Sequence, residues 1–123
     1  MLSEDAAKTV IVVSARKPEP SLEREMEARQ IRVRWAASIK AATALLDAAP
    51  DGTVIITELA LRDGNWRDLI EAVGRLGKSF RVALVSPISS PELWWDALKC
   101  GVEDVVPAPL SVACICKYLR SYF

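Results

Sequence analysis

The sequence predicts an α/β domain in which five parallel strands form one sheet covered by helices on both faces. Four short apolar runs, rich in β-branched residues, are typical of strands that are buried on both sides. These runs are residues 9–13, 53–57, 81–85 and 102–106. Helical patterns separate them, so each strand reaches its neighbour through a crossover helix. We therefore predict a doubly wound sheet in the strand order 2-1-3-4-5, with five helices.

The first half of the chain contains the one weak strand of this pattern. Pro20 can occupy the first turn of a helix that continues through Arg29. Residues 31–35 then alternate apolar side chains with two arginines, which is expected of an edge strand with one face in water. Ser38 is the predicted N-cap of the second helix, whose apolar face begins at Ile39.

The second half repeats the alternation of strand and helix. Residues 66–76 place apolar side chains on one stripe and predict the third helix. Ser90, Pro91 and Glu92 combine a cap, a first-turn proline and a first-turn acid, so they predict the start of the fourth helix. Gly101 is its expected end, and residues 111–122 predict the fifth helix. We expect a single domain over residues 1–123.

The composition excludes several classes of protein. Sixteen basic and sixteen acidic side chains give a formal charge of +0, so there is no overall attraction to nucleic acid or to an anionic membrane, and we expect neither as a partner. The absence of histidine excludes Ser–His and Cys–His nucleophile pairs and zinc sites with a histidine ligand. A chain of 123 residues can bury enough surface to form a core without a metal or disulfide, and we expect no metal and no cofactor.

The cysteines and the amino terminus indicate a cytoplasmic location. The chain has three cysteines, Cys100, Cys114 and Cys116. An odd number without paired spacing favours free thiols in a reducing compartment. Residues 1–8 contain two acids and no apolar stretch, so they do not resemble a signal peptide. No run approaches the roughly 18 apolar residues that a membrane-spanning helix needs.

The candidate site lies where the predicted strands end, because open α/β sheets bind ligands beyond the carboxyl ends of their strands. Residues 14–18 contain no glycine, which argues against a phosphate-binding loop for a nucleotide. The residues that follow the strands are Ser14, Ala15, Arg16, Glu58, Ser86, Pro87, Pro107, Ala108 and Pro109.

Two segments, residues 54–61 and 97–109, give the chain a resemblance to the receiver domain of bacterial response regulators. The resemblance extends from about Thr9 to Tyr122 and implies a flavodoxin-like fold and a role in two-component signal transduction. It places Glu58 where the family has the aspartate that accepts a phosphoryl group. The family's Mg²⁺-binding acidic pair corresponds to Ser14 and Ala15, its hydroxyl residue to Ser86, and its lysine–proline pair to Ala108 and Pro109.

These departures predict a degenerate receiver that does not undergo aspartyl-type phosphorylation. Phosphoryl transfer requires a cation to neutralise the developing charge, and Mg²⁺ binds through hard oxygen ligands that usually include carboxylates. Ser14 and Ala15 supply no carboxylate, and Ala108 supplies no ammonium group. Glu58 places its carboxylate one methylene further out than an aspartate would.

Two interpretations of Glu58 remain open. Its longer side chain either imitates a phosphorylated aspartate, or it is a solvated or hydrogen-bonded acid at a strand end. We favour the second interpretation, because no lysine or metal is expected nearby to receive the charge. Ser86 either donates a hydrogen bond to Glu58 or serves as a turn residue before Pro87. Asp63 and Gly64 are interpreted as a turn after the third strand.

The resemblance also implies a surface for dimers or protein partners on the fourth helix, fifth strand and fifth helix. Trp94 and Trp95 are adjacent in the fourth helix and diverge by about 100°, so at least one must be partly exposed. The alternative is that one packs in the core while the other lies flat on the helix. Tyr118 and Tyr122 are further candidates, and Val105 occupies a position that is often aromatic in the family.

The sequence thus predicts a non-enzymatic regulatory domain that acts through protein–protein contact. One alternative is a receiver that still switches by residual phosphorylation or by another input signal. An alternative of a different class is a small α/β enzyme that uses the same cleft, although no nucleophile–base pair is visible.

Overall fold

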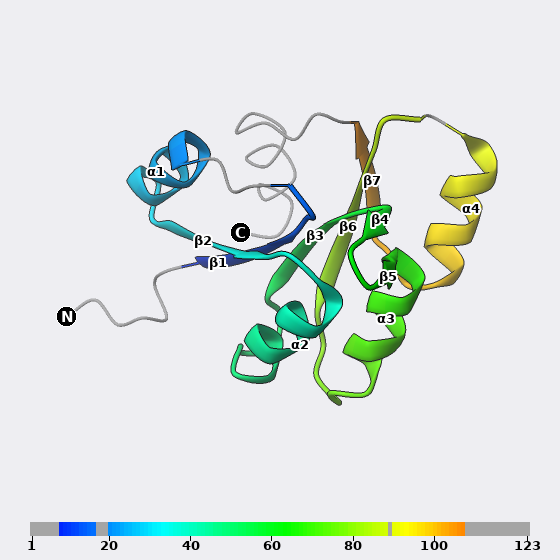
Figure 1. Ribbon diagram of the computed structural model, residues 1–123, viewed down its shortest axis with the longest axis horizontal. Helices are drawn as coiled ribbons and strands as arrows, with labels where there is room; N and C mark the ends of the chain where they lie inside the picture. The colour runs from blue at the N-terminus through cyan, green and yellow to red at the C-terminus, as the bar shows by residue number, and fades with distance from the viewer. Residues whose placement is uncertain (1–7, 17–19, 89, 108–123) are drawn as a thin grey trace.

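The computed structural model of the chain describes residues 8–16, 20–88 and 90–107 (Figure 1). The strands of the main sheet alternate with helices along these residues, as the apolar runs predict. In chain order the elements are β1 (Lys8–Val13), α1 (Pro20–Ala28), β2 (Ile31–Ala36), α2 (Ile39–Asp47), β3 (Val54–Glu58), β4 (Ala60–Leu61), β5 (Gly64–Asn65), α3 (Trp66–Gly74), β6 (Arg81–Ser86), α4 (Pro91–Lys99) and β7 (Asp104–Pro107).

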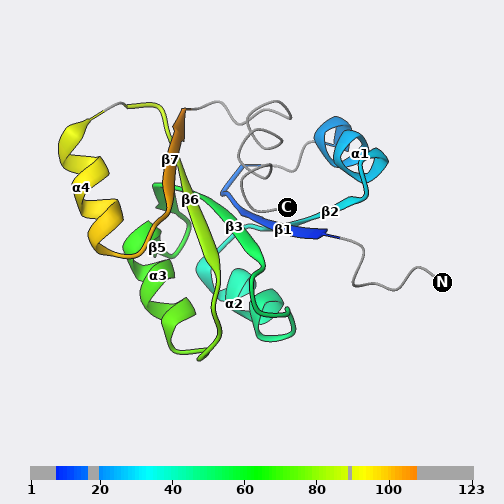
Figure 2. The ribbon, with the colours of Figure 1, turned by 180° about the vertical axis from the view of Figure 1, so that it is seen from behind.

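The main sheet contains five parallel strands in the order β2-β1-β3-β6-β7. Because β6 and β7 are its fourth and fifth strands along the chain, the predicted order 2-1-3-4-5 and the flavodoxin-like fold are confirmed. Figure 2 shows β2 with α1 at one side of the molecule and β7 with α4 at the other. The short antiparallel pair β4–β5 has no counterpart in the predicted pattern.

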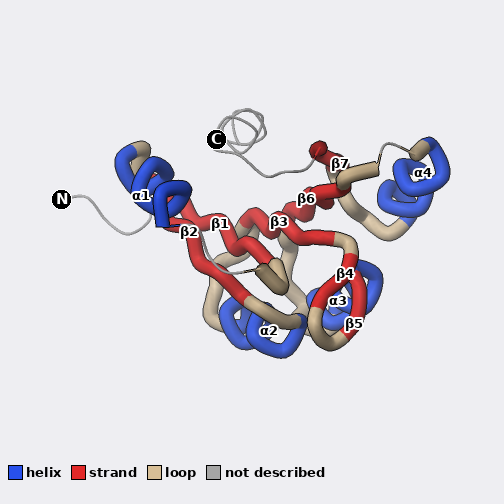
Figure 3. The backbone as a smooth tube through the Cα atoms, turned by 45° about the horizontal axis from the view of Figure 1, so that its top comes forward, coloured by secondary structure: helices blue, strands red, loops and turns tan. Residues whose placement is uncertain are grey.

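The two faces of the sheet carry separate apolar cores, because successive side chains of a strand point to opposite faces. Along β1, Val10 and Val12 belong to the core that includes Met26 of α1. Ile11 and Val13 belong to the core that α2, α3 and α4 cover. Figure 3 shows α1 on one face of the sheet and α2 and α3 on the other.

The predicted helix signals are confirmed within the described residues. The hydroxyls of Ser38 and Ser90 accept hydrogen bonds from the first turns of α2 and α4. Gly101 follows α4 with φ of 93°, a conformation that glycine adopts at little cost. Helix α3 ends at Gly74, two residues before the predicted end. The fifth helix, predicted over residues 111–122, lies outside the described residues, and no helix within them is long and apolar enough to cross a membrane.

Both ends of α2 are tied to side chains that are distant in the sequence. At the amino end, the carboxylate of Asp63 accepts hydrogen bonds from the backbone N–H groups of Ile39 at 2.7 Å and Lys40 at 3.1 Å. At the carboxyl end, the Lys78 ammonium group donates to backbone carbonyls, including that of Asp47. These groups satisfy donors and acceptors that a helix leaves unpaired at its termini. The turn predicted at Asp63 and Gly64 is confirmed, and it also anchors α2.

Candidate functional site: the carboxyl edge of the sheet

The carboxyl ends of the central strands meet at one edge of the sheet. Val13 at the end of β1 pairs with Thr57 of β3, and Glu58 pairs with Val85 of β6. Next to them, Ser86 at the end of β6 pairs with Pro107 of β7. The structure therefore brings together the strand ends that the sequence places at the candidate site.

A hydrogen bond and an ion pair hold the Glu58 side chain at this edge. The buried hydroxyl of Ser14 donates a hydrogen bond of 2.9 Å to Glu58 Oε1. The other carboxylate oxygen, Oε2, lies 3.5 Å from Nε of Arg16. Ser14 also accepts a hydrogen bond of 3.0 Å from the backbone N–H of Arg16. We call Ser14, Arg16 and Glu58 the Glu58 cluster.

The Glu58 cluster adds a basic group to the site and supports one interpretation from the sequence. The sequence interpretation considered only a lysine or a metal as a partner for Glu58, whereas the structure places the Arg16 guanidinium in ion-pair range. The interpretation of Glu58 as a hydrogen-bonded acid agrees with its contact with Ser14. Arg16 lies in the segment that follows the first strand, so its place in the sequence identifies it as a site residue. Its pairing with Glu58 depends on the adjacency of β1 and β3.

The donor set of the Glu58 cluster does not fit the Mg²⁺ ion that the fold implies. Mg²⁺ is usually bound through one or two carboxylates in near-octahedral geometry. Here the Ser14 hydroxyl hydrogen points to Glu58, the Ala15 side chain has no oxygen, and the Glu58 carboxylate already faces a cation. Among the described residues, no group of three or more His, Cys, Asp or Glu side chains is placed to hold a metal ion.

Ser86, the last residue of β6, directs its hydroxyl to the turn that follows the strand. Its buried hydroxyl donates to the carbonyl of Ile88 at 2.8 Å and accepts from the Ile88 N–H at 3.0 Å. Both contacts belong to the loop that follows β6, and within the described residues no hydrogen bond joins Ser86 to Glu58. Of the other predicted site residues, Ala15 is exposed, whereas Ala108 and Pro109 lie outside the described residues.

The tryptophans of α4 are both exposed. The exposed fraction is 39% for Trp94 and 65% for Trp95, and Leu98 beside them is 43% exposed. Residues three and four apart are neighbours on a helix, so Leu98 joins both rings into one apolar patch, which we call the α4 patch. The alternative in which one ring packs in the core is therefore wrong. The buried Ala97 takes the core-facing position of this turn.

The remaining predicted interface residues have different outcomes. Val105 lies in β7, pairs with Leu84 and packs against the core that α4 covers, so it is only partly exposed. Tyr118 and Tyr122 lie outside the described residues. The α4 patch is therefore the part of the predicted surface that the structure describes.

Strand order, helix placement and the acid at the end of β3 define a doubly wound α/β domain with its candidate site at the carboxyl edge. No family model matches the chain, and no curated protein matches it in sequence. Its structure is similar to that of a two-component response regulator from Clostridium difficile, with a TM-score of 0.80, 16% identity and 93% of each chain covered. It is also similar to a CheY-like receiver domain protein from Methanospirillum hungatei, with a TM-score of 0.79, 16% identity, and 94% of this chain and 92% of that chain covered.

A third similar structure contains a chemically modified site. It is a response regulator from Burkholderia pseudomallei with a phosphorylated aspartic acid and a calcium ion. The TM-score is 0.75 at 24% identity, and the match covers 89% of this chain but 64% of that longer chain. These similarities show that the chain has the fold of response-regulator receiver domains.

Proposed function

We propose that this chain is a cytoplasmic regulatory domain of the receiver type that acts through protein–protein contact and does not accept a phosphoryl group at Glu58. The observation that carries this proposal is the Glu58 cluster. At the end of β3, the acid forms an ion pair with Arg16 and accepts a hydrogen bond from Ser14. A domain built in this way does not need an aspartyl phosphate to complete its site.

The chemistry of phosphoryl transfer supports the proposal. A metal ion that bridges the phosphoryl oxygens normally neutralises the charge that develops there. The Glu58 cluster has one carboxylate, and that carboxylate is already paired with a guanidinium. An attack by Glu58 on a phosphodonor would break this ion pair and the hydrogen bond from Ser14, without Mg²⁺ ligands at Ser14 or Ala15 to compensate.

The test is incubation with a small phosphodonor and Mg²⁺, followed by intact mass measurement of the wild type and of Glu58→Gln. We expect no stoichiometric phosphoryl adduct on either protein. An adduct on the wild type that disappears in Glu58→Gln would overturn the proposal. An adduct on both proteins would place the modification at another residue.

The α4 patch supports protein contact as the mode of action. Tryptophan is enriched at interface hot spots, and burial of apolar surface drives association. Trp94, Trp95 and Leu98 expose such surface together on one helix. We propose that this face, with β7 beside it, binds a protein partner or a second copy of the chain.

Sedimentation velocity of the wild type, Trp94→Ala and Trp95→Ala tests the homodimer form of this proposal. We expect concentration-dependent association of the wild type and its loss in both variants. Arg24→Ala, an exposed substitution on α1, is the matched control and is expected to associate normally. Equal association of all four proteins would remove the α4 patch from the interface.

A further inference from the structure

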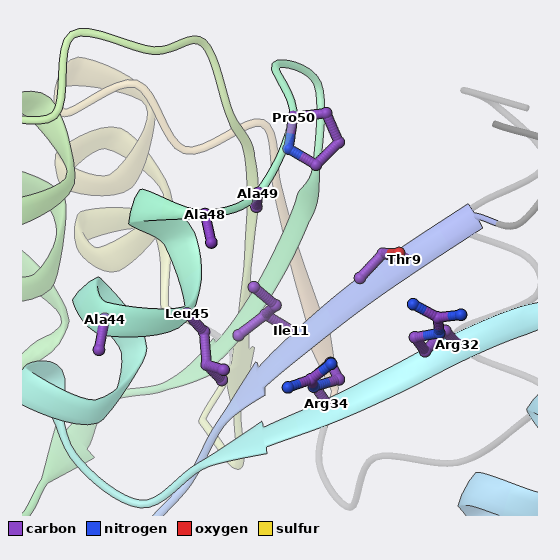
Figure 4. A pocket seen from close by; sticks show the side chains of 9 residues that line it. All are labelled: Thr9, Ile11, Arg32, Arg34, Ala44, Leu45, Ala48, Ala49 and Pro50. Carbon is purple, nitrogen blue, oxygen red and sulfur yellow. The ribbon is translucent and has the colours of Figure 1, made fainter. Parts of the chain in front are cut away.

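A second candidate interaction surface lies at the β2 edge of the sheet, on the face that α2 covers. The α4 patch lies near the opposite edge, which β7 forms. The second surface is a groove of about 200 Å³ between β1, β2 and the carboxyl-terminal half of α2. Figure 4 shows Ile11 and Leu45 projecting into the groove between α2 and the sheet, with Arg32 and Arg34 along β2. We call it the Arg32–Arg34 groove.

Within the part of the chain that the structure describes, no partner competes with an anion for the two arginines of the groove. Both are exposed, and within the described residues neither forms a hydrogen bond or an ion pair. They lie two residues apart on the edge strand β2, so their side chains share one face at a spacing of about 6.6 Å along the strand. Like charges on neighbouring positions of one face repel each other, and bound carboxylates would relieve that repulsion.

The surface beside the arginines is apolar. Ile11 is 1% exposed, Leu45 is half-buried, and Ala44 and Ala48 present only methyl groups. A ligand that lies in the groove therefore meets hydrocarbon from Ile11 of β1 and from α2, the hydroxyl of Thr9 further along β1, and positive charge on the side of β2. This combination suits a molecule that carries carboxylates next to an apolar group.

We propose that the Arg32–Arg34 groove docks an acidic segment of a partner protein, with an apolar side chain over Ile11 and Leu45 and carboxylates at the two arginines. A volume of about 200 Å³ is below the roughly 300–1,000 Å³ of small-molecule pockets, but it accommodates a single side chain. Two guanidinium groups on one face of a strand can each bind one carboxylate of the same peptide. The groove and the α4 patch lie near opposite edges of the sheet, so this surface is additional to the proposed function.

The first experiment measures fluorescence anisotropy of a fluorescein-labelled peptide that has glutamates around a central leucine. We expect saturable binding to the wild type that weakens as salt is raised. Arg32→Ala and Arg34→Ala should each weaken binding about two- to fivefold, and Arg32→Glu with Arg34→Glu more than tenfold. Because both arginines are exposed, we expect all these variants to keep the circular dichroism spectrum of the wild type.

Matched controls separate the groove from general electrostatics. Arg24→Ala removes an exposed charge from α1, on the other face of the sheet, and should leave binding unchanged. Ala44→Met keeps both arginines but fills the groove from the exposed side of α2, and should weaken binding several-fold. A peptide with glutamine in place of glutamate should not bind.

Three results would overturn the proposal. One is the absence of saturable peptide binding to the wild type. Another is an equal loss of binding in Arg24→Ala and in the groove variants, which would indicate general charge attraction. The third is tighter binding of a single-stranded oligonucleotide through the same two arginines, which would assign the groove to nucleic acid.

Discussion

The Glu58 cluster makes a quantitative prediction for Ser14→Ala. Ser14 is 6% exposed, and its hydroxyl both donates to Glu58 and accepts from the backbone of Arg16. A hydrogen bond to a charged group contributes about 1.5–3 kcal/mol when it is shielded from water. The Glu58 side chain is 27% exposed, which lowers the expected loss of unfolding free energy to about 1–2 kcal/mol.

The corresponding change in melting temperature follows from the chain length. For 123 residues the unfolding entropy is about 0.26 kcal/mol per kelvin, so Ser14→Ala should melt about 4–8 °C below the wild type. Arg16→Ala removes a partner whose side chain is 76% exposed, and should lower the melting temperature by at most about 2 °C. Thermal unfolding by circular dichroism, with urea titration for the free energies, measures both changes.

The control is Ser79→Ala, which removes the same hydroxyl from an exposed loop position. The substitution keeps the backbone N–H of residue 79, which donates a hydrogen bond to Asp51. We expect it to change the unfolding free energy by less than about 0.5 kcal/mol. If Ser14→Ala behaved like Ser79→Ala, the hydrogen bond to Glu58 would contribute nothing to stability, and the argument for an internally satisfied site would fail.

Two further predictions concern the β4–β5 turn. Backbone hydrogen bonds, above all that from Ile39, hold the pKa of Asp63 below its ordinary value of 3.8. The stability that this carboxylate contributes is therefore present above pH 3.8 and is lost as pH falls through the lower folded-state pKa. In urea titrations, Asp63→Asn should be less stable than the wild type at pH 7, and the difference should shrink in acid; a pH-independent difference would contradict this. At Gly64, an added Cβ would lie 2.5 Å from Asp68 Oδ2 and 2.9 Å from Ile39 Cδ1, so Gly64→Ala should cost about 1–3 kcal/mol. Gly74→Ala is its control, because a Cβ there meets nothing within 4 Å, and equal stability of the two variants would disprove the proposed crowding.

Local patterns in the sequence predict much of the fold. The buried β-branched runs define the strands, and the arginines of residues 31–35 identify the edge strand because one of its faces is in water. Ser38, Ser90 and Gly101 mark helix ends because their chemistry acts on backbone groups within one turn. These signals depend on residues that are neighbours in the chain, so they can be recognised in the sequence without the tertiary structure.

Contacts between residues that are distant in the sequence can be identified only in the folded molecule. Asp63 binds the start of α2 from 24 positions away in sequence, and Lys78 binds its end, although each resembles an ordinary turn or surface residue in sequence. The exposure of both tryptophans of α4 likewise depends on which side of the helix packs against the sheet.

The candidate site depends both on residue types that the sequence shows and on contacts that only the fold creates. The sequence by itself determined that an acid ends the third strand and that neither Ser14 nor Ala15 supplies a second carboxylate. Only the tertiary structure decided that Ser14 and Arg16 reach that acid, because β1 and β3 are neighbours in the sheet although Glu58 lies 44 positions after Ser14 in the sequence. An ion pair depends on distance in space, and the strand order sets that distance.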